Sequence, residues 1–107
     1  MYFCNYEERE TKELFPGIRA KTFWSENMLL SVLEMDPHTV VPLHSHPHEQ
    51  AGTVYEGEFD MTIGGETKTL KPGDTYMIPG GVEHTVTIGD KTVRALDIFS
   101  PVREEYK

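Results

Sequence analysis

Short runs of apolar and β-branched residues alternate with turn residues along most of this chain. In residues 58–63, Phe59, Met61 and Ile63 alternate with polar positions, which is the period of two expected of a half-buried strand. Two glycines follow at 64–65, and because both can adopt the positive φ of a primed turn, we predict a two-residue hairpin there. The same pattern, broken by Gly, Pro, Asn and Asp, predicts further strands at 18–24, 28–35, 39–43, 53–55, 66–70, 74–78, 84–88 and 91–99.

The spacing of these runs indicates the fold class. No stretch combines a sustained 3.6-residue apolar period with helix caps, so helix content should be very low. Strands that recur about every eight to twelve residues favour a sandwich or a barrel, and a short chain covers its sheet edges best by closing them. We therefore predict one all-β domain over residues 1–107: a jelly-roll barrel at 18–100, an N-terminal arm at 1–16 and a C-terminal tail at 101–107.

Composition narrows the class of partner. Ten Lys and Arg residues against eighteen Asp and Glu residues give a net charge of -8, which repels nucleic acid and anionic lipid. With Cys4 as the single cysteine, an intrachain disulfide is excluded. We expect no signal peptide and no transmembrane helix, because the sequence has neither a basic leader nor a run of 18 apolar residues. We expect a cytoplasmic protein that binds a small molecule, with no nucleic-acid or membrane partner.

The stretch 44–50, His-Ser-His-Pro-His-Glu-Gln, concentrates groups that bind metals. On a strand, His44 and His46 share a face and can reach one ion, and Gln50 can bring a side-chain oxygen to it after a loop. His84 can enter from a later strand. Three neutral nitrogens and one oxygen leave coordination positions open, which suits a divalent catalytic ion such as Mn, Fe, Co, Ni or Zn. The alternative is a cluster of surface histidines in a flexible loop.

The residues around this stretch resemble two motifs of the cupin superfamily. The first motif is similar to His44-x-His46-x3-Gln50-x6-Gly57, and the second is similar to Gly73-x5-Pro79-x-Gly81-x2-His84. The resemblance covers residues 44–84 and implies a cupin fold, the double-stranded β-helix form of the jelly-roll barrel.

Three residues depart from these motifs. His38 stands where the first motif usually has glycine, Gln50 where it usually has glutamate, and Ile88 where the second often has asparagine. Exchanging a carboxylate for an amide removes one negative charge beside the ion, which becomes a stronger Lewis acid and holds an anionic ligand better. The exchange argues against the oxygenase chemistry typical of three histidines and one glutamate.

Within the cupins, the sequence resembles the KdgF-type proteins of pectin and alginate breakdown. The likeness rests on residues 44–50, 56–59 and 63–66 and on the pattern Asp97-x-Phe99-x-Pro101-x-Arg103. The resemblance implies an enzyme that converts a cyclic 4,5-unsaturated uronate to its linear 5-keto form, with Asp97 catalytic and Phe99 and Arg103 binding the substrate. Cupins of one barrel often pair through a sheet face and exchange N-terminal segments, so the resemblance also implies a homodimer.

The residues of this C-terminal pattern also make physical sense by themselves. Asp97 and Phe99 share strand parity with other apolar positions of 93–99, so both face inward if that face forms the core. For Phe99, core packing is the first interpretation and a ring that faces the substrate is the second. Burying a carboxyl group costs free energy, so we expect an inward Asp97 to have either a functional role or a hydrogen-bonding or charged partner. In the alternative, the opposite apolar face of the strand forms the core and Asp97 faces solvent. Arg103 is either a solvated tail charge or, at a barrel mouth, a group that binds a carboxylate through two parallel hydrogen bonds.

The remaining polar and aromatic residues near the two motifs are not expected to bind the ion. We expect His48 at the rim of the pocket, Glu49 in solvent or hydrogen-bonded to a ligand histidine, and Glu83 pointing away from the ion. His38 is expected in a turn, and Tyr76 is expected to be a core or interface aromatic.

Two other functions stay open at this point. A metal-dependent dioxygenase would use the same open coordination positions for O2, and a non-catalytic cupin would bind a sugar or an anion without turnover. One fold can host enzymes and binding proteins alike.

Overall fold

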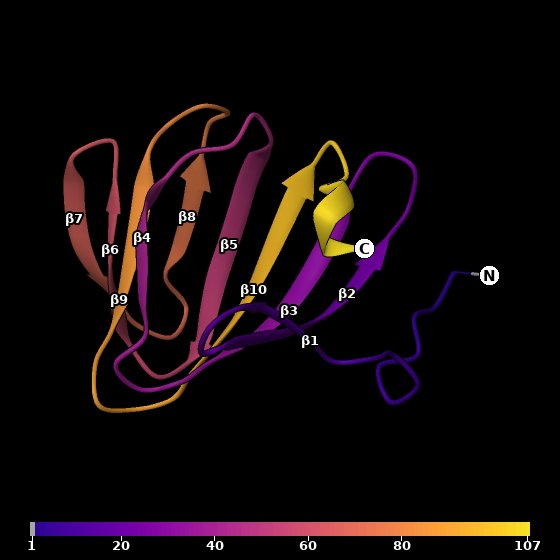
Figure 1. Ribbon diagram of the computed structural model, residues 1–107, viewed down its shortest axis with the longest axis horizontal. Helices are drawn as coiled ribbons and strands as arrows, with labels where there is room; N and C mark the ends of the chain where they lie inside the picture. Colours follow the sequence, from indigo (N-terminus) through magenta and orange to yellow (C-terminus); the bar gives the residue numbers. More distant parts are fainter. Residues whose placement is uncertain (1) are drawn as a thin grey trace.

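Two antiparallel β-sheets contain the ten strands of the described residues. The computed structural model describes residues 2–107, so Met1 of the expected N-terminal arm lies outside it (Figure 1). The six-stranded sheet has the order β1-β2-β3-β10-β5-β8, formed by β1 Lys12–Phe15, β2 Ile18–Trp24, β3 Leu29–Met35, β10 Val93–Ser100, β5 Glu49–Glu56 and β8 Thr75–Ile78. The four-stranded sheet has the order β4-β9-β6-β7, formed by β4 Val40–His44, β9 His84–Ile88, β6 Phe59–Ile63 and β7 Glu66–Leu70.

The predicted fold class is confirmed. The described residues form a single all-β domain, and their one helical segment is the 3₁₀ turn η1, Glu104–Tyr106. The predicted hairpin joins β6 to β7, with φ of 53° at Gly64 and 85° at Gly65. Within residues 2–107, no helix is long and apolar enough to cross a membrane.

Two strands differ from the pattern-based expectation. β5 begins at Glu49 rather than at residue 53, because it lies between β10 and β8 and pairs with both. Hydrogen bonding on both edges extends this strand over polar residues that hydrophobic alternation does not mark. β1 forms within the expected N-terminal arm, where it pairs antiparallel with β2. Its charged sequence gave no apolar alternation, so only the pairing partner reveals it.

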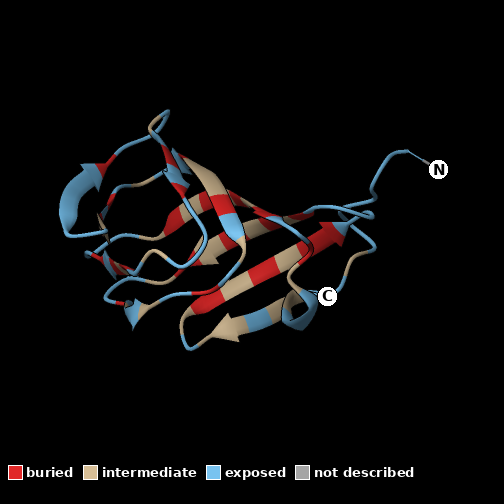
Figure 2. Ribbon diagram, turned by 90° about the horizontal axis from the view of Figure 1, so that it is seen from above, coloured by how far each residue is buried: buried red, intermediate tan, exposed pale blue. Residues whose placement is uncertain are grey.

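Strand β10 has the alternation that positions the candidate site. Its residues 93, 95, 97 and 99 are buried, whereas 94, 96 and 98 are only partly so, and Figure 2 shows such alternating burial along the strands. Asp97 and Phe99 therefore face inward, and the alternative in which Asp97 faces solvent is wrong. Because β10 pairs with β3 on one edge and β5 on the other, the orientation of its side chains is fixed on both sides.

Apolar side chains from both sheets fill the space between them. The main core cluster consists of Ile18, Ala20, Leu33, Met35, Val54, Phe59, Met61, Leu70, Tyr76, Ile78, Val86, Ile88, Val93 and Ala95. A smaller cluster of Leu29, Phe99 and Val102 packs against Tyr106 of η1. The hydroxyl of Thr22 donates to the main-chain oxygen of Tyr106 at 2.6 Å, so the C-terminal tail is folded onto the barrel beside Phe99.

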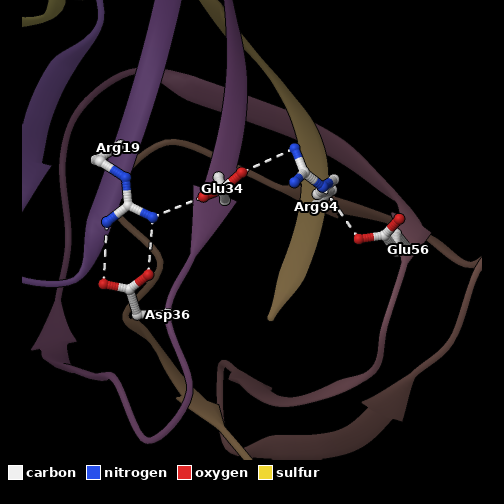
Figure 3. Close-up of polar contacts among 5 residues, drawn as sticks. All are labelled: Arg19, Glu34, Asp36, Glu56 and Arg94. Atoms are coloured by element: carbon white, nitrogen blue, oxygen red, sulfur yellow. Dashed lines mark hydrogen bonds and ion pairs between the residues drawn. The ribbon is translucent and has the colours of Figure 1, made fainter. Parts of the chain in front are cut away.

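A row of charged side chains crosses the outer face of the six-stranded sheet (Figure 3). Arg19 on β2, Glu34 on β3, Arg94 on β10 and Glu56 on β5 are successive cross-strand neighbours. Glu34 accepts from Arg19 at 2.7 Å and pairs with Arg94 at 2.8 Å, and Arg94 donates to Glu56 at 3.0 Å. Arg19 also donates to both oxygens of Asp36, which lowers the pKa of that carboxyl. The row is well exposed, so its alternating charges favour this strand order and register more than they add stability.

Candidate metal centre

Three imidazoles converge at one end of the barrel. His44 is the last residue of β4, His84 is the first residue of β9, and the two are paired in the register of these strands. The ring centroid of His46 lies 5.0 Å from that of His84, and one ring nitrogen from each of the three histidines lies within 4.8 Å of the others. His46 and His84 are buried, with 9% and 2% of their surfaces exposed.

The main chain fixes which nitrogen of each ring carries the hydrogen. Nδ1 of each histidine lies beside a carbonyl oxygen: Pro42 at 2.8 Å from His44, His48 at 3.0 Å from His46, and Val82 at 2.9 Å from His84. A carbonyl oxygen can only accept, so Nδ1 must donate, and in a neutral ring the lone pair is then on Nε2. Burial is the main factor that lowers the pKa of His46 and of His84, which favours the neutral rings.

The side-chain oxygen of Gln50 lies beside these imidazole nitrogens. Its Oε1 lies 3.0 Å from Nε2 of His46, while its Nε2 donates to Oδ2 of Asp97 at 3.2 Å. The carbonyl oxygen and the imidazole lone pair are both acceptors, so without a positive ion between them they repel. Nε2 of His84 is also buried without a hydrogen-bond partner.

These donors fit a divalent transition metal. Adjacent ligands bonded at about 2.1 Å lie about 3 Å apart around one ion, close to the separation between His46 and Gln50. Imidazole nitrogens with an amide oxygen are ligands that suit several such ions, and four protein ligands around an octahedral ion would leave two positions for a small molecule.

His46 lies in a loop, and not on a strand as the sequence predicts. β4 ends at His44, so His46 lies in the connection to β5 and not on the same strand face. The connection is held by the loop between β8 and β9, where the main-chain nitrogen of Gly81 donates to the oxygen of His46 at 2.8 Å. A Cβ at Gly80 would lie 2.3 Å from the oxygen of Pro47, so the close approach requires glycine.

Asp97 lies behind Gln50 and is almost fully buried, with 8% of its surface exposed. Its second carboxylate oxygen accepts a hydrogen bond from the hydroxyl of Tyr76. Burial raises the pKa of Asp97 to about 6, against the opposing effects of the hydrogen bonds from Tyr76 and Gln50 and the charge of Arg103. Burial and the charge of Asp97 raise the pKa of Tyr76 well above its usual value, so its hydroxyl stays a donor.

Phe99 and Arg103 line the same cavity as His44 and His84. The ring of Phe99 meets that of His46 edge-on at 5.7 Å. The guanidinium of Arg103 lies over Phe99 at 5.2 Å and over Tyr106 at 4.0 Å, within cation-π range. Its Nε is 3.3 Å from a carboxylate oxygen of Glu105, an ion pair without well-formed hydrogen-bond geometry.

The comparisons with known proteins agree with this architecture. The model of the cupin domain matches residues 31–99. The chain belongs to the cupin family. A curated relative, the pectin degradation protein KdgF of Dickeya dadantii, is 31% identical, and the match covers 98% of this chain and 96% of that protein.

Solved structures of cupins superpose over the whole chain. An RmlC-like cupin from Shewanella frigidimarina has a TM-score of 0.92 with 26% identity, and the match covers 100% of this chain and 96% of that one. KdgF from a Halomonas species has a TM-score of 0.90 with 27% identity, over 100% and 99% of the two chains. The resemblance to cupins and to KdgF-type proteins expected from the motifs is therefore confirmed.

The cupin barrel encloses a cavity of about 460 Å³ that reaches the candidate site. Its polar end is lined by His44, His84, Gln50, Tyr76, Asp97, Arg103, Glu105 and Tyr106, and Phe99 adds an aromatic wall. The other end is lined mainly by the apolar core. A volume of this size lies within the range of cavities that bind small molecules.

His38, His48, Glu49 and Glu83, to which the sequence assigns minor roles, do not line this cavity. His38 is exposed in a turn with φ of 63°, and Glu49 and Glu83 are exposed to solvent. His48 does not line the cavity, but its main-chain oxygen holds His46 in place.

Tyr76 is buried in the core, as expected. Its hydroxyl also donates to Asp97 inside the cavity, a contact that nothing in the local sequence indicates.

Proposed function

We propose that this cupin is a metal-dependent enzyme that converts a cyclic 4,5-unsaturated uronate to its linear 5-keto form. The observation that carries the proposal is a buried acid, Asp97, hydrogen-bonded to a candidate metal ligand, Gln50, in the same cavity as Arg103. The similarity to KdgF, a protein named for pectin degradation, supports this class of substrate.

We propose that His44, His46, Gln50 and His84 hold the ion. When bound, a divalent ion such as Mn, Fe, Co, Ni or Zn would supply Lewis-acid charge to oxygen atoms of the substrate. Gln50 carries no charge, so this set of ligands leaves the full charge of the ion available to an anionic sugar.

The substrate's carboxylate is the group that Arg103 is placed to bind. In a chain with a net charge of -8, an anionic substrate needs local positive charge, and Arg103 is a cation on the wall of the cavity. Its planar guanidinium suits a carboxylate, with two parallel hydrogen bonds. Phe99 and Tyr106 stack on it and fix its orientation, and Phe99 also offers an apolar surface to the sugar ring.

Asp97 is the proton-transfer group of the proposal. Ring opening of the enol ether needs proton movement at the ring oxygen and at C4, and a carboxyl group whose pKa is raised to about 6 can both accept and release a proton near neutral pH. Asp97 is almost fully buried and lines the cavity that would hold the substrate.

The test is the ultraviolet absorbance of the unsaturated uronate, which disappears when the enol ether is lost. Metal-loaded protein should remove it, and Asp97→Asn should slow the reaction about 100-fold or more, the usual contribution of a general acid or base. Asp60→Asn is a matched control, because Asp60 is exposed on β6. No acceleration by metal-loaded protein, or full activity in Asp97→Asn, would rule out this function.

The dioxygenase and the non-catalytic sugar- or anion-binding cupin stay alternatives. Oxygen uptake with an enolic substrate would favour the first, and tight binding of a sugar acid without turnover would favour the second. The homodimer and the cytoplasmic location expected from the sequence also stay predictions.

A further inference from the structure

Asp97, Gly52 and Tyr76 form one row across three neighbouring strands. The register pairs Asp97 on β10 with Gly52 on β5, and Gly52 with Tyr76 on β8. The hydroxyl of Tyr76 reaches across Gly52 to donate to Oδ1 of Asp97. A Cβ at position 52 would lie 2.3 Å from that oxygen and 2.3 Å from the hydroxyl oxygen. The contact therefore exists because residue 52 has no side chain.

The two oxygens of Asp97 serve different partners. Oδ1 accepts from Tyr76 and Oδ2 accepts from Nε2 of Gln50 at 3.2 Å. A side-chain amide has a donor end and an acceptor end, so an amide nitrogen held at Asp97 leaves the carbonyl oxygen facing Nε2 of His46. Turned by half a revolution, Gln50 would present an NH₂ group to the imidazoles, and NH₂ of an amide does not bind a cation.

We propose that Tyr76 is a positioning residue that acts through Asp97 to hold the carbonyl oxygen of Gln50 toward the three histidines, and that Gly52 is the residue that admits this contact. The inference rests on the metal site of the proposed function. Without the hydroxyl, the carboxylate of Asp97 keeps a single protein donor and is free to turn. Gln50 then loses the fixed acceptor that sets its orientation.

The first measurement uses the metal-free protein, so it does not depend on the reaction. Gln50 is the only glutamine in the chain, so labelling glutamine with ¹⁵N in its side-chain amide gives one NH₂ signal pair in an NMR spectrum. The proton that faces Asp97 should exchange slowly with solvent in the wild type. In Tyr76→Phe its exchange should accelerate about fivefold to tenfold, as expected for the loss of about one hydrogen bond's net contribution.

The second measurement is the affinity for Zn²⁺, determined by competition with a chelator. Loss of a group that orients a metal ligand costs about 10- to 100-fold in metal affinity or activity, and Tyr76→Phe should fall in this range. In the turnover assay kcat should fall while KM changes little, because Arg103 is untouched. Tyr55→Phe is the matched control, since Tyr55 is an exposed residue with 51% of its surface accessible. It should leave amide exchange, Zn²⁺ affinity, kcat and KM unchanged.

Gly52→Ala tests the same contact from the other side. It should reproduce the loss of amide protection and of metal affinity, and the double variant with Tyr76→Phe should lose little more than the stronger single variant, because both remove one contact. Circular dichroism spectra establish that each variant is folded.

Unchanged amide exchange and unchanged Zn²⁺ affinity in folded Tyr76→Phe would overturn the inference. If instead the wild type leaves the uronate intact while Tyr76→Phe still releases the amide proton and weakens Zn²⁺ binding, the inference stands and the proposed function fails.

Discussion

His44 and His84 are direct partners across the β4–β9 pairing, with their ring centroids 4.2 Å apart. Both belong to the four-stranded sheet, whereas Gln50 belongs to the six-stranded sheet. An ion bound by this set would therefore join the two sheets. Metal binding should then stabilise the whole fold as well as serve the reaction, because a ligand that binds only the folded state adds its binding free energy to stability.

Removal of the metal is the first test. Wild-type protein at a free Zn²⁺ concentration of 1,000 times Kd should gain about 4 kcal/mol over the same protein in a chelator. His84→Ala should retain no Zn²⁺ after dialysis and should show no such gain, as measured by elemental analysis and thermal unfolding.

His38→Asn is the control for that variant. His38 is an exposed turn residue with φ of 63°, a conformation that asparagine tolerates. It should bind Zn²⁺ like the wild type. Retention of a stoichiometric ion in His84→Ala would contradict the ligand set.

Gln50→Glu restores the carboxylate more usual at this position. It should bind the metal at least as tightly, because the added charge attracts the cation. It should also lose activity, because its carboxylate would face Asp97, which now lies 3.2 Å from the amide nitrogen of Gln50. Metal affinity and turnover measured on the same sample separate the two effects, and a fully active Gln50→Glu would show that the amide is not needed.

The pH dependence of stability in metal-free protein reports on Asp97. Burial raises its pKa from 3.8 to about 6, so between these values the folded state binds the proton more tightly than the unfolded state. Stability contributed by the protonated carboxyl is present below about pH 4 and is lost as the pH rises to about 6.

Asp97→Asn lacks this titration. Relative to the wild type, its free energy of unfolding should increase by about 2 kcal/mol between pH 4 and pH 7, from a pKa shift of about two units. Urea denaturation across that range measures the difference. A difference that stays constant with pH would contradict the buried, proton-binding carboxyl.

Arg103→Lys tests the carboxylate site. Lysine keeps the charge but loses the planar pair of donors and the stacking on Phe99 and Tyr106. KM for the uronate should rise about tenfold or more, in line with the loss of one charge-assisted hydrogen bond, while Zn²⁺ affinity stays the same. Arg94→Lys, in the charged row on the outer sheet face, should leave KM unchanged.

The sequence predicts the fold well because most of its strands carry their own signal. Alternation at Phe59, Met61 and Ile63 and the two glycines after them define β6, a turn and β7 without reference to any distant residue. The parity of Asp97 also follows from its own strand, although only the structure decides which apolar face is buried. The candidate metal ligands stand out in the sequence for a similar reason, since three of the four lie within seven residues.

The missed features depend on pairings between distant segments. Tyr76 meets Asp97 only because β8 and β10 flank β5 on either side, an order that no local pattern encodes. The one local signal is Gly52, because a glycine inside a strand often marks a place where another group packs closely. It does not indicate that this group is the side chain of Tyr76. His46 was placed on a strand because alternation cannot tell where β4 ends, and the support from Gly80 and Gly81 comes from a loop more than thirty residues away.

The proposed metal ligands and the C-terminal residues of the cavity lie in separate segments of the chain. The proposed metal ligands all lie between residues 44 and 84, whereas Arg103, Glu105 and Tyr106, which line the same cavity, lie within residues 101–107. That segment is attached to the barrel by the small Leu29–Phe99–Val102 cluster and by the hydroxyl of Thr22. Under the proposed function, replacement of residues 101–107 would change the contacts to the substrate without altering any of the four proposed metal ligands.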